Sequence, residues 1–202
     1  LKKILIIIIA YLIILTPWTL RNYEKHEAFM PTTSRLGYML FLSNNDYNSE
    51  IIQKGGYERT EKFNDILEKS KLLDVSKQSN FLINQSIDEI LENKLLFTKT
   101  LVYRMINTLH YRPNPYKLSK SNNDLVMFLM WTPILFLSIF SLLRRPSKIE
   151  LILLIFIFYT LFVHLPFWGF PRFRYPIDAL FIYLAFTNFL YLKSYLIKDK
   201  PK

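Results

Sequence analysis

The sequence predicts an all-α, polytopic membrane protein with about four transmembrane helices and a helical extracytoplasmic loop. Hydrophobic residues make up 51% of the 202 residues and aromatic residues 16%, which is more apolar than an average soluble domain. The charged residues, 21% of the chain, are absent from the interiors of four long stretches and gather between them. Long uncharged runs separated by charged segments are typical of chains that cross a bilayer several times.

Each of the four apolar stretches approaches the roughly 20 residues that span a bilayer core. A secretory signal peptide is the alternative for the first stretch, because two lysines precede it. No small-residue cleavage site follows that stretch, so we expect a retained crossing. The predicted crossings are Ile4 to Leu20, Leu125 to Leu143, Leu151 to Phe167 and Ile177 to Leu192.

The distribution of basic residues predicts the orientation of these crossings. Basic residues outnumber acidic ones in the flanks of alternate crossings, and such flanks face the cytoplasm. Both termini are therefore expected on the cytoplasmic side of a bacterial inner membrane. Residues 1–20 form a transmembrane helix, residues 21–124 an extracytoplasmic loop, and residues 125–202 three transmembrane helices with a cytoplasmic tail. The cytoplasmic positive charges are Lys2, Lys3, Arg144, Arg145, Lys148, Lys193, Lys198, Lys200 and Lys202.

The extracytoplasmic loop is expected to begin irregularly and then become helical. Turn-forming residues fill its first third. Apolar residues then recur at helical spacing among charged ones over residues 58–73 and 80–91. Residues 94–111 place Phe97, Leu101, Val102 and Met105 opposite polar residues, a pattern that suits either a helix in the bilayer interface or an ordinary packed helix. The prolines at 113 and 115 end this helix.

Several classes of function are disfavoured by composition. The chain has no cysteine for a thiol nucleophile or a thiolate metal site, and its four glycines cannot form a nucleotide-binding loop. The formal net charge of +10 consists mostly of membrane-anchoring charge, so nucleic acid is not an expected partner. No cofactor is predicted, although the sequence leaves a divalent metal open. Asp46, Glu50 and Glu58 could do acid–base work, but solvated surface is the simpler interpretation.

The segment between the last two apolar stretches is the strongest candidate site. It runs from His164 to Pro176 and places Arg172 and Arg174 on the outer side, against the positive-inside bias. Guanidinium groups bind phosphate through two parallel hydrogen bonds, and a lipid-linked phosphate lies at this depth. The alternative is that the two arginines contact lipid headgroups or pair with Asp178.

The motifs of the chain resemble those of bacterial GT-C superfamily membrane glycosyltransferases. The relatives would be the dolichyl-phosphate-mannose protein mannosyltransferase-like and aminoarabinose transferase-like proteins. The resemblance covers nearly the whole chain in order, although Ser43 replaces a glycine of the family pattern. It rests on Pro17-Trp18-Thr19-Leu20-Arg21-Asn22-Tyr23, Gly37-Tyr38-Met39-Leu40, Asn44-Asn45 and Pro171-Arg172-Phe173-Arg174-Tyr175-Pro176.

The resemblance implies transfer of a sugar from a polyprenyl-phosphate donor on the extracytoplasmic face. Arg172 and Arg174 would hold the lipid phosphate, and Arg21, Asn22, Tyr38 and Asn44 would shape the outer cavity. The family's catalytic acid lies in an earlier loop, so the chain is expected to be a C-terminal portion, with an N-terminal portion and membrane lipids as its other partners. A non-catalytic membrane scaffold and a lipid-handling protein are the alternatives, and the sequence assigns no catalytic residue.

Overall fold

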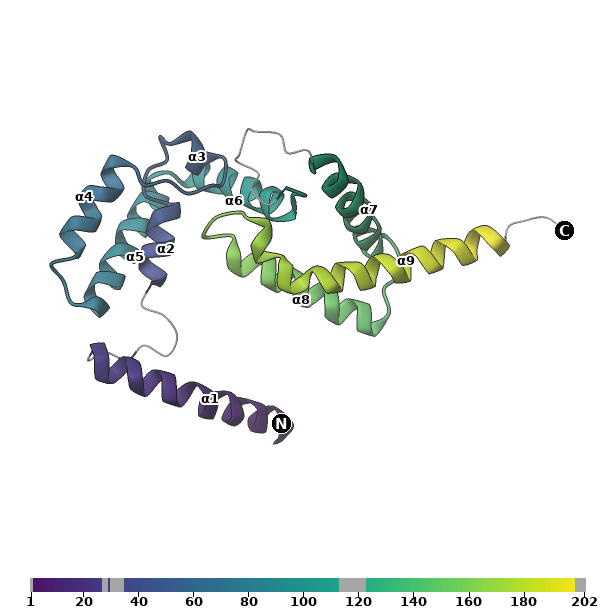
Figure 1. Ribbon diagram of the computed structural model, residues 1–202, viewed down its shortest axis with the longest axis horizontal. Coiled ribbons are helices and arrows are strands. Elements are labelled where there is room, and N and C mark those ends of the chain that lie inside the picture. The colour runs from purple at the N-terminus through teal and green to yellow at the C-terminus, as the bar shows by residue number, and fades with distance from the viewer. Residues whose placement is uncertain (1, 27–28, 30–34, 113–122, 199–202) are drawn as a thin grey trace. The chain divides into compact units, whose positions relative to one another are not determined.

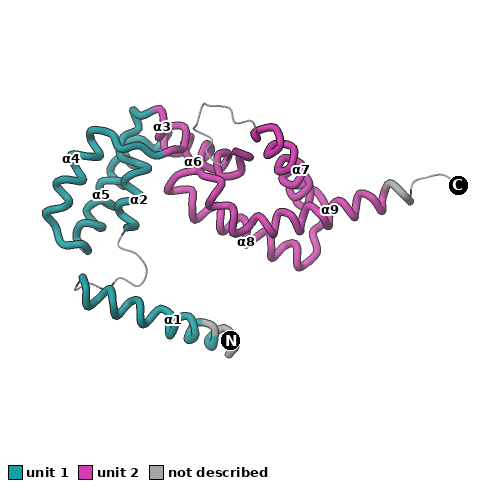
Figure 2. Tube along the Cα trace, in the orientation of Figure 1, with its two compact units in different colours: residues 1–49, 57–94 teal, residues 50–56, 95–202 magenta. Residues whose placement is uncertain are grey.

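The computed structural model describes residues 2–26, 29, 35–112 and 123–198, and these residues form helices and no strands (Figure 1). They divide into two compact units, residues 1–49 with 57–94 and residues 50–56 with 95–202 (Figure 2). The all-α prediction is therefore confirmed for the described residues. The helices are α1 (Lys2–His26), α2 (Leu36–Ser43), α3 (Glu50–Gln53), α4 (Glu61–Ser70), α5 (Val75–Glu92), α6 (Lys94–Leu109), α7 (Asp124–Leu143), α8 (Lys148–His164) and α9 (Asp178–Lys198), with 3₁₀ turns η1 (Pro171–Phe173) and η2 (Tyr175–Ile177).

The three helices predicted within residues 58–111 are confirmed as α4, α5 and α6. The expectation of a largely irregular segment before them is wrong in part, because α1 continues to His26 and α2 forms from Leu36 to Ser43. Turn-forming residues flank the short apolar run of α2, which forms a helix because it buries Phe41 and Leu42. The prolines predicted to end α6 lie outside the described residues, and α6 ends before them at Leu109.

Two helices are long and apolar enough to cross a membrane, judged by length and composition. These are α7 and the stretch Tyr175–Tyr195, which contains most of α9. The other two apolar stretches also form helices, α1 and α8. A crossing by α1 or α8, and the sides on which the loops lie, remain proposals.

The first unit is held together by close packing of α2 against α5. A β-carbon added to Gly37 of α2 would lie 2.1 Å from the carbonyl oxygen of Ser79 in α5, so only glycine allows this approach. Phe41 stacks on Phe63 of α4 with ring centroids 5.4 Å apart, and both side chains are fully buried. Aromatic packing therefore supports the glycine contact in a small core.

The second unit contains a narrow core surrounded by exposed apolar surface. Helix α9 packs against both α7 and α8, and its buried residues Phe181 and Leu184 join the inner face of α8. The rest of α8 is apolar and exposed, with large side chains such as Ile152, Ile155 and Phe162 more than half accessible. An exposed apolar surface of this kind requires apolar surroundings.

Candidate functional site

The candidate site is the α8–α9 hairpin, defined as residues 165–177. Three prolines within it fix the backbone φ angle near −65° and remove hydrogen-bond donors, which stops α8 and favours short turns. Pro171 and Pro176 occupy early positions of η1 and η2, where the missing N–H group costs little. The two turns set the positions of Arg172 and Arg174 before α9 begins.

Arg104 of α6 anchors the first part of the hairpin. Its side chain is 0% exposed, and its Nη1 donates to the carbonyl oxygens of Leu165 at 3.1 Å and Pro166 at 2.8 Å. These carbonyls follow the last turn of α8, where helical acceptors lack internal partners and the helix dipole attracts positive charge. Arg104 therefore caps the C-terminus of α8.

Two glycines allow the chain to approach the backbone of Arg104 from separate segments. The Gly169 N–H donates to the carbonyl oxygen of Gly55 at 3.0 Å. A β-carbon on Gly169 would lie 2.3 Å from the Arg104 carbonyl oxygen, and one on Gly55 would lie 2.8 Å from the Arg104 nitrogen. Gly55 also has a φ of +84°, which disfavours other residues. The hairpin and residues 50–56 are thus fitted closely to α6.

Arg174 anchors the second part of the hairpin and is 4% exposed. Its Nε donates to Asp178 Oδ1 at 2.8 Å, and its Nη1 donates to the carbonyl oxygens of Thr108 and His110 at 3.3 and 3.0 Å. Its guanidinium carbon lies 3.5 Å from the ring centroid of Trp131. Arg174 thus caps the C-terminus of α6, just as Arg104 of α6 caps α8. Of the alternatives that the sequence left open, pairing with Asp178 holds for Arg174.

Arg172 has a different environment from Arg174, because it is exposed. Its guanidinium carbon lies 5.3 Å from the ring centroids of Phe170 and Phe173 and 5.8 Å from that of Trp168. These three rings form what we term the aromatic cradle. Among the residues that the structure describes, the ion pairs do not include Arg172. The cradle orients the cation while leaving it accessible to an anion.

Two histidines border the hairpin. His164 stacks on Phe173 with ring centroids 4.7 Å apart, and its Nδ1 lies 2.7 Å from the Thr160 carbonyl oxygen. Burial lowers the pKa of His110, and the nearby charges of Arg112 and Arg174 lower it further. His110 Nδ1 accepts a hydrogen bond from the Arg112 N–H at 3.0 Å, which requires that nitrogen to be unprotonated. A neutral His110 adds no further positive charge beside Arg112 and Arg174.

The other predicted site residues lie in the first unit. Arg21 of α1 is exposed and lies over Trp18 at 5.2 Å, whereas the neighbouring Asn22 is buried. Both belong to the helical extension of the first apolar stretch beyond residue 20. The structure therefore places Arg21 and Asn22 on a regular helix and only Arg21 at its surface.

Tyr38 and Asn44 lie at opposite ends of α2. The Tyr38 hydroxyl accepts from Arg59 Nη2 at 2.9 Å. Asn44 is fully buried, and its Nδ2 donates to the Leu40 carbonyl oxygen while its Oδ1 accepts from the Tyr47 hydroxyl at 2.7 Å. Asn44 thus organises the turn after α2. The Tyr38 hydroxyl and the Arg59 guanidinium group form a hydrogen-bonded pair at the surface.

The three carboxylates considered for acid–base work each contact a residue close in sequence. Asp46 accepts from the Asn48 N–H at 2.9 Å, Glu58 accepts from the Ser49 hydroxyl at 2.5 Å, and Glu50 pairs with Lys54 at 2.9 Å. The Lys54 hydrogen bond and charge lower the pKa of Glu50. A carboxylate with a lowered pKa is a weaker base, so Glu50 does not acquire the properties of a general base.

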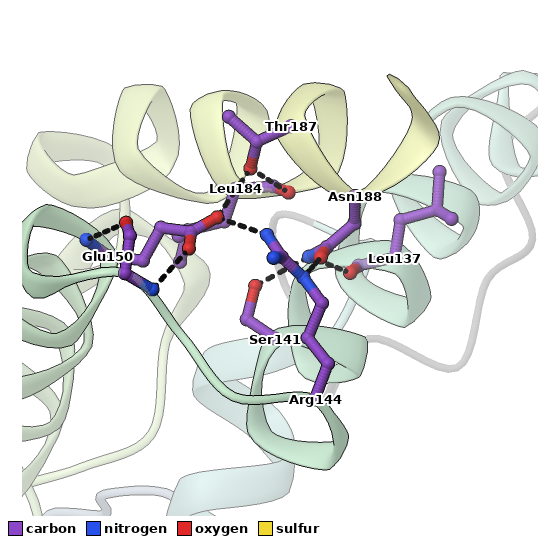
Figure 3. A network of polar contacts seen from close by, with 8 residues as sticks. Leu137, Ser141, Arg144, Glu150, Leu184, Thr187 and Asn188 are labelled. Carbon is purple, nitrogen blue, oxygen red and sulfur yellow. Dashed lines mark hydrogen bonds and ion pairs between the residues drawn. The ribbon is translucent and has the colours of Figure 1, made fainter. Parts of the chain in front are cut away.

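Sequence reasoning missed a polar network at the end of the α7–α8–α9 bundle remote from the hairpin (Figure 3). Arg144, after α7, donates to Glu150 of α8 and to Asn188 of α9. Glu150 also accepts from the Thr187 hydroxyl at 3.0 Å, and the Asn188 amide donates to Ser141. The sequence signal was the pair Thr187 and Asn188 inside an apolar stretch. The network connects all three helices through buried polar groups.

Comparison with models of known protein families, with curated protein sequences and with solved structures finds no match to the chain. The resemblance to GT-C glycosyltransferases therefore stays a prediction. Within the described ranges no group of three or more His, Asp or Glu residues could hold a metal ion. The features that define this protein are an all-helical fold with two helices capable of crossing a membrane and the arginine-capped hairpin of the second unit.

Proposed function

We propose that this chain is part of an integral-membrane glycosyltransferase that uses a polyprenyl-phosphate-linked sugar donor on the extracytoplasmic face. One observation carries the proposal: Arg172 presents an exposed guanidinium group on the aromatic cradle. The cradle lies in the chain between the C-terminus of the apolar helix α8 and the N-terminus of the apolar helix α9. An anion attached to a long hydrocarbon chain fits such a boundary, because its phosphate requires a cation and its tail requires apolar surroundings.

The three hairpin-associated arginines have different roles in this proposal. Arg172 contacts the phosphate directly. Arg174 and Arg104 are positioning residues, since both are buried and donate to backbone carbonyls. For the first unit the proposal assigns the accessible groups of Arg21 and Tyr38 to contact with the sugar or its acceptor, and Asn22 and Asn44, which are buried, to the structure of the unit.

The proposal requires four crossings by α1, α7, α8 and α9, with both termini in the cytoplasm of a bacterial cell. The chain lacks cysteine, so single cysteines can report the orientation. A membrane-impermeant thiol reagent should label Leu72→Cys in intact cells and Lys148→Cys only after permeabilisation. Both positions are exposed, so accessibility within the fold does not limit labelling. Labelling of Lys148→Cys alone in intact cells would reverse the orientation and remove the basis for an extracytoplasmic site.

Binding of polyprenyl phosphate to the purified chain in detergent tests the role of Arg172. Arg172→Ala should weaken binding about tenfold to a hundredfold, because one charge-assisted hydrogen bond contributes about 1.5–3 kcal/mol. Arg172→Lys should also weaken binding, because a fork that donates two hydrogen bonds becomes a single ammonium group.

The matched control is Arg145→Ala, which removes the same charge from an exposed position after α7. Arg145→Ala should bind polyprenyl phosphate as the unmodified chain does. The corresponding polyprenol, which lacks phosphate, should bind the unmodified chain and Arg172→Ala equally. Unchanged phosphate binding in both Arg172 variants would assign Arg172 to general contact with lipid headgroups.

A non-catalytic lipid-handling role is the second candidate. It is favoured by the local hydrogen bonds of Asp46, Glu50 and Glu58, which leave the catalytic acid unassigned within the described residues. Under this alternative the chain binds the lipid phosphate but transfers no sugar in any assembly that contains it. Measuring sugar transfer by such an assembly, with and without Arg172→Ala, separates the two candidates.

A further inference from the structure

Helix α6 has its polar side buried and its apolar side exposed. The buried residues Thr100, Arg104 and Thr108 recur every four positions and so form one stripe along the helix. Thr100 donates to the Gln53 carbonyl oxygen at 3.4 Å, and Arg104 donates to the hairpin carbonyls. The polar stripe therefore faces protein that belongs to the same unit.

The opposite face of α6 carries large apolar side chains. Leu95 is 88% exposed, Val102 59% and Ile106 54%. In a water-soluble helix the apolar stripe faces the protein interior and the polar stripe faces solvent. Helix α6 departs from this arrangement, because its buried stripe is polar while its exposed surface, which also carries Thr98 and Lys99, includes these three large apolar side chains. Water is an unfavourable medium for those side chains.

Two features favour the interfacial layer of a lipid bilayer as the medium of these side chains. First, the half-buried Met105 and Leu109 of α6 line a groove of about 210 Å³ together with Leu135 of α7 and Leu161 of α8, which joins the apolar side of α6 to the apolar helices α7 and α8. Second, the exposed face includes Lys99, whose ammonium lies 6.0 Å from the Tyr103 ring centroid. Lysine and tyrosine side chains suit the headgroup level, where an apolar stem and a polar tip are both solvated.

We infer that α6 lies in the plane of the extracytoplasmic interface of the membrane and inserts Leu95, Val102 and Ile106 into the lipid. Its buried face then holds residues 50–56 and the hairpin at the level of the headgroups. The inference depends on embedding of the second unit in a bilayer, as the proposed function does, but not on phosphate binding or on sugar transfer.

Nitroxide spin labels on single cysteines test this inference in the full chain, reconstituted into vesicles of phosphatidylethanolamine and phosphatidylglycerol. Molecular oxygen concentrates in the bilayer, and a nickel chelate remains in water, so their relative collision rates with the label report its depth. Labels at Val102 and Ile106 should collide more with oxygen than with the nickel chelate. A label at Ile155 in α8 reports whether the bilayer surrounds the unit, and one at Glu68, on the exposed surface of α4, is the aqueous reference.

The four labels distinguish failure of this inference from failure of the membrane assignment. Val102 and Ile106 labels that match Glu68 while Ile155 remains in lipid would place α6 in water and overturn the inference. Labels at Val102 and Ile106 shielded from both reagents would show a protein partner on this face and would overturn it equally. An Ile155 label exposed to the nickel chelate would contradict the embedding itself, and with it the proposed function.

Discussion

Replacing Arg174 with alanine is expected to destabilise the second unit by about 3–5 kcal/mol, since it removes a buried guanidinium group with all its hydrogen bonds and leaves the partly buried Asp178 carboxylate without its ion partner. The substitution removes the donors to Thr108, His110 and Asp178, and it also removes the cation over Trp131. The C-terminus of α6 then loses the guanidinium group that caps it. The melting temperature of the purified chain in detergent should fall accordingly.

Arg172→Ala is the matched control, because it truncates the same type of residue two positions earlier in the hairpin. Arg172 is exposed and forms no ion pair with the described residues, so its loss should change the free energy of unfolding by less than about 1 kcal/mol. The two variants should thus separate stability from phosphate binding. Equal melting temperatures for both would contradict the assignment of Arg174 as a buried cap.

A similarly large loss of stability is expected for Glu150→Ala at the other end of the bundle. The Glu150 carboxylate accepts from Arg144, Thr187 and the N–H of Ser147, and the Ser147 hydroxyl accepts from the Glu150 N–H to complete a capping box. Removing the carboxylate leaves Arg144 partly buried beside Asn188 without its ion partner. We expect a loss of about 3–5 kcal/mol in the same thermal unfolding measurement.

The pair Arg144→Met with Glu150→Leu tests whether the ion pair or the packing is responsible. Replacing both charges with apolar groups can be neutral, whereas breaking a buried pair is costly. The double variant should therefore unfold at a higher temperature than Glu150→Ala, and Arg145→Ala should unfold like the unmodified chain. A double variant less stable than Glu150→Ala would show that the bond from Arg144 to Asn188 dominates the network.

Much of the helical framework could be predicted from periodicity, because an uncharged run or a stripe of apolar residues specifies a helix whatever surrounds it. The helices over residues 61–70, 75–92 and 94–109 follow from this pattern. Helix α2 does not follow from this pattern, because its apolar run is short and turn-forming residues flank it. Gly37 shows why, because glycine is needed there only for the close approach of the Ser79 backbone, which lies far away in sequence.

The sequence indicated the segment that holds the candidate site but not the separate roles of its two arginines. Two arginines against the positive-inside bias identified the hairpin. Their different roles depend on burial, which sequence spacing does not determine: Arg174 points into the protein and Arg172 does not. Arg104 shows the same limit, because a polar residue of α6 is buried while the apolar Val102 of the same helix is exposed. Periodicity defines the two faces of a helix, and the surrounding medium decides which of them is outside.

A direct contact between Arg172 and a lipid phosphate is the central claim, and solid-state NMR measures it. The chain, labelled with ¹⁵N in its arginine side chains and reconstituted with polyprenyl phosphate as the only phosphorus-containing lipid, is saturated with that ligand, and ¹⁵N–³¹P dipolar dephasing reports whether guanidinium groups lie beside phosphorus. Dephasing by the lipid phosphate should be present in the unmodified chain and in Arg145→Ala and absent in Arg172→Ala. Dephasing of equal size in Arg172→Ala would show that another arginine holds the phosphate and would contradict the proposed site.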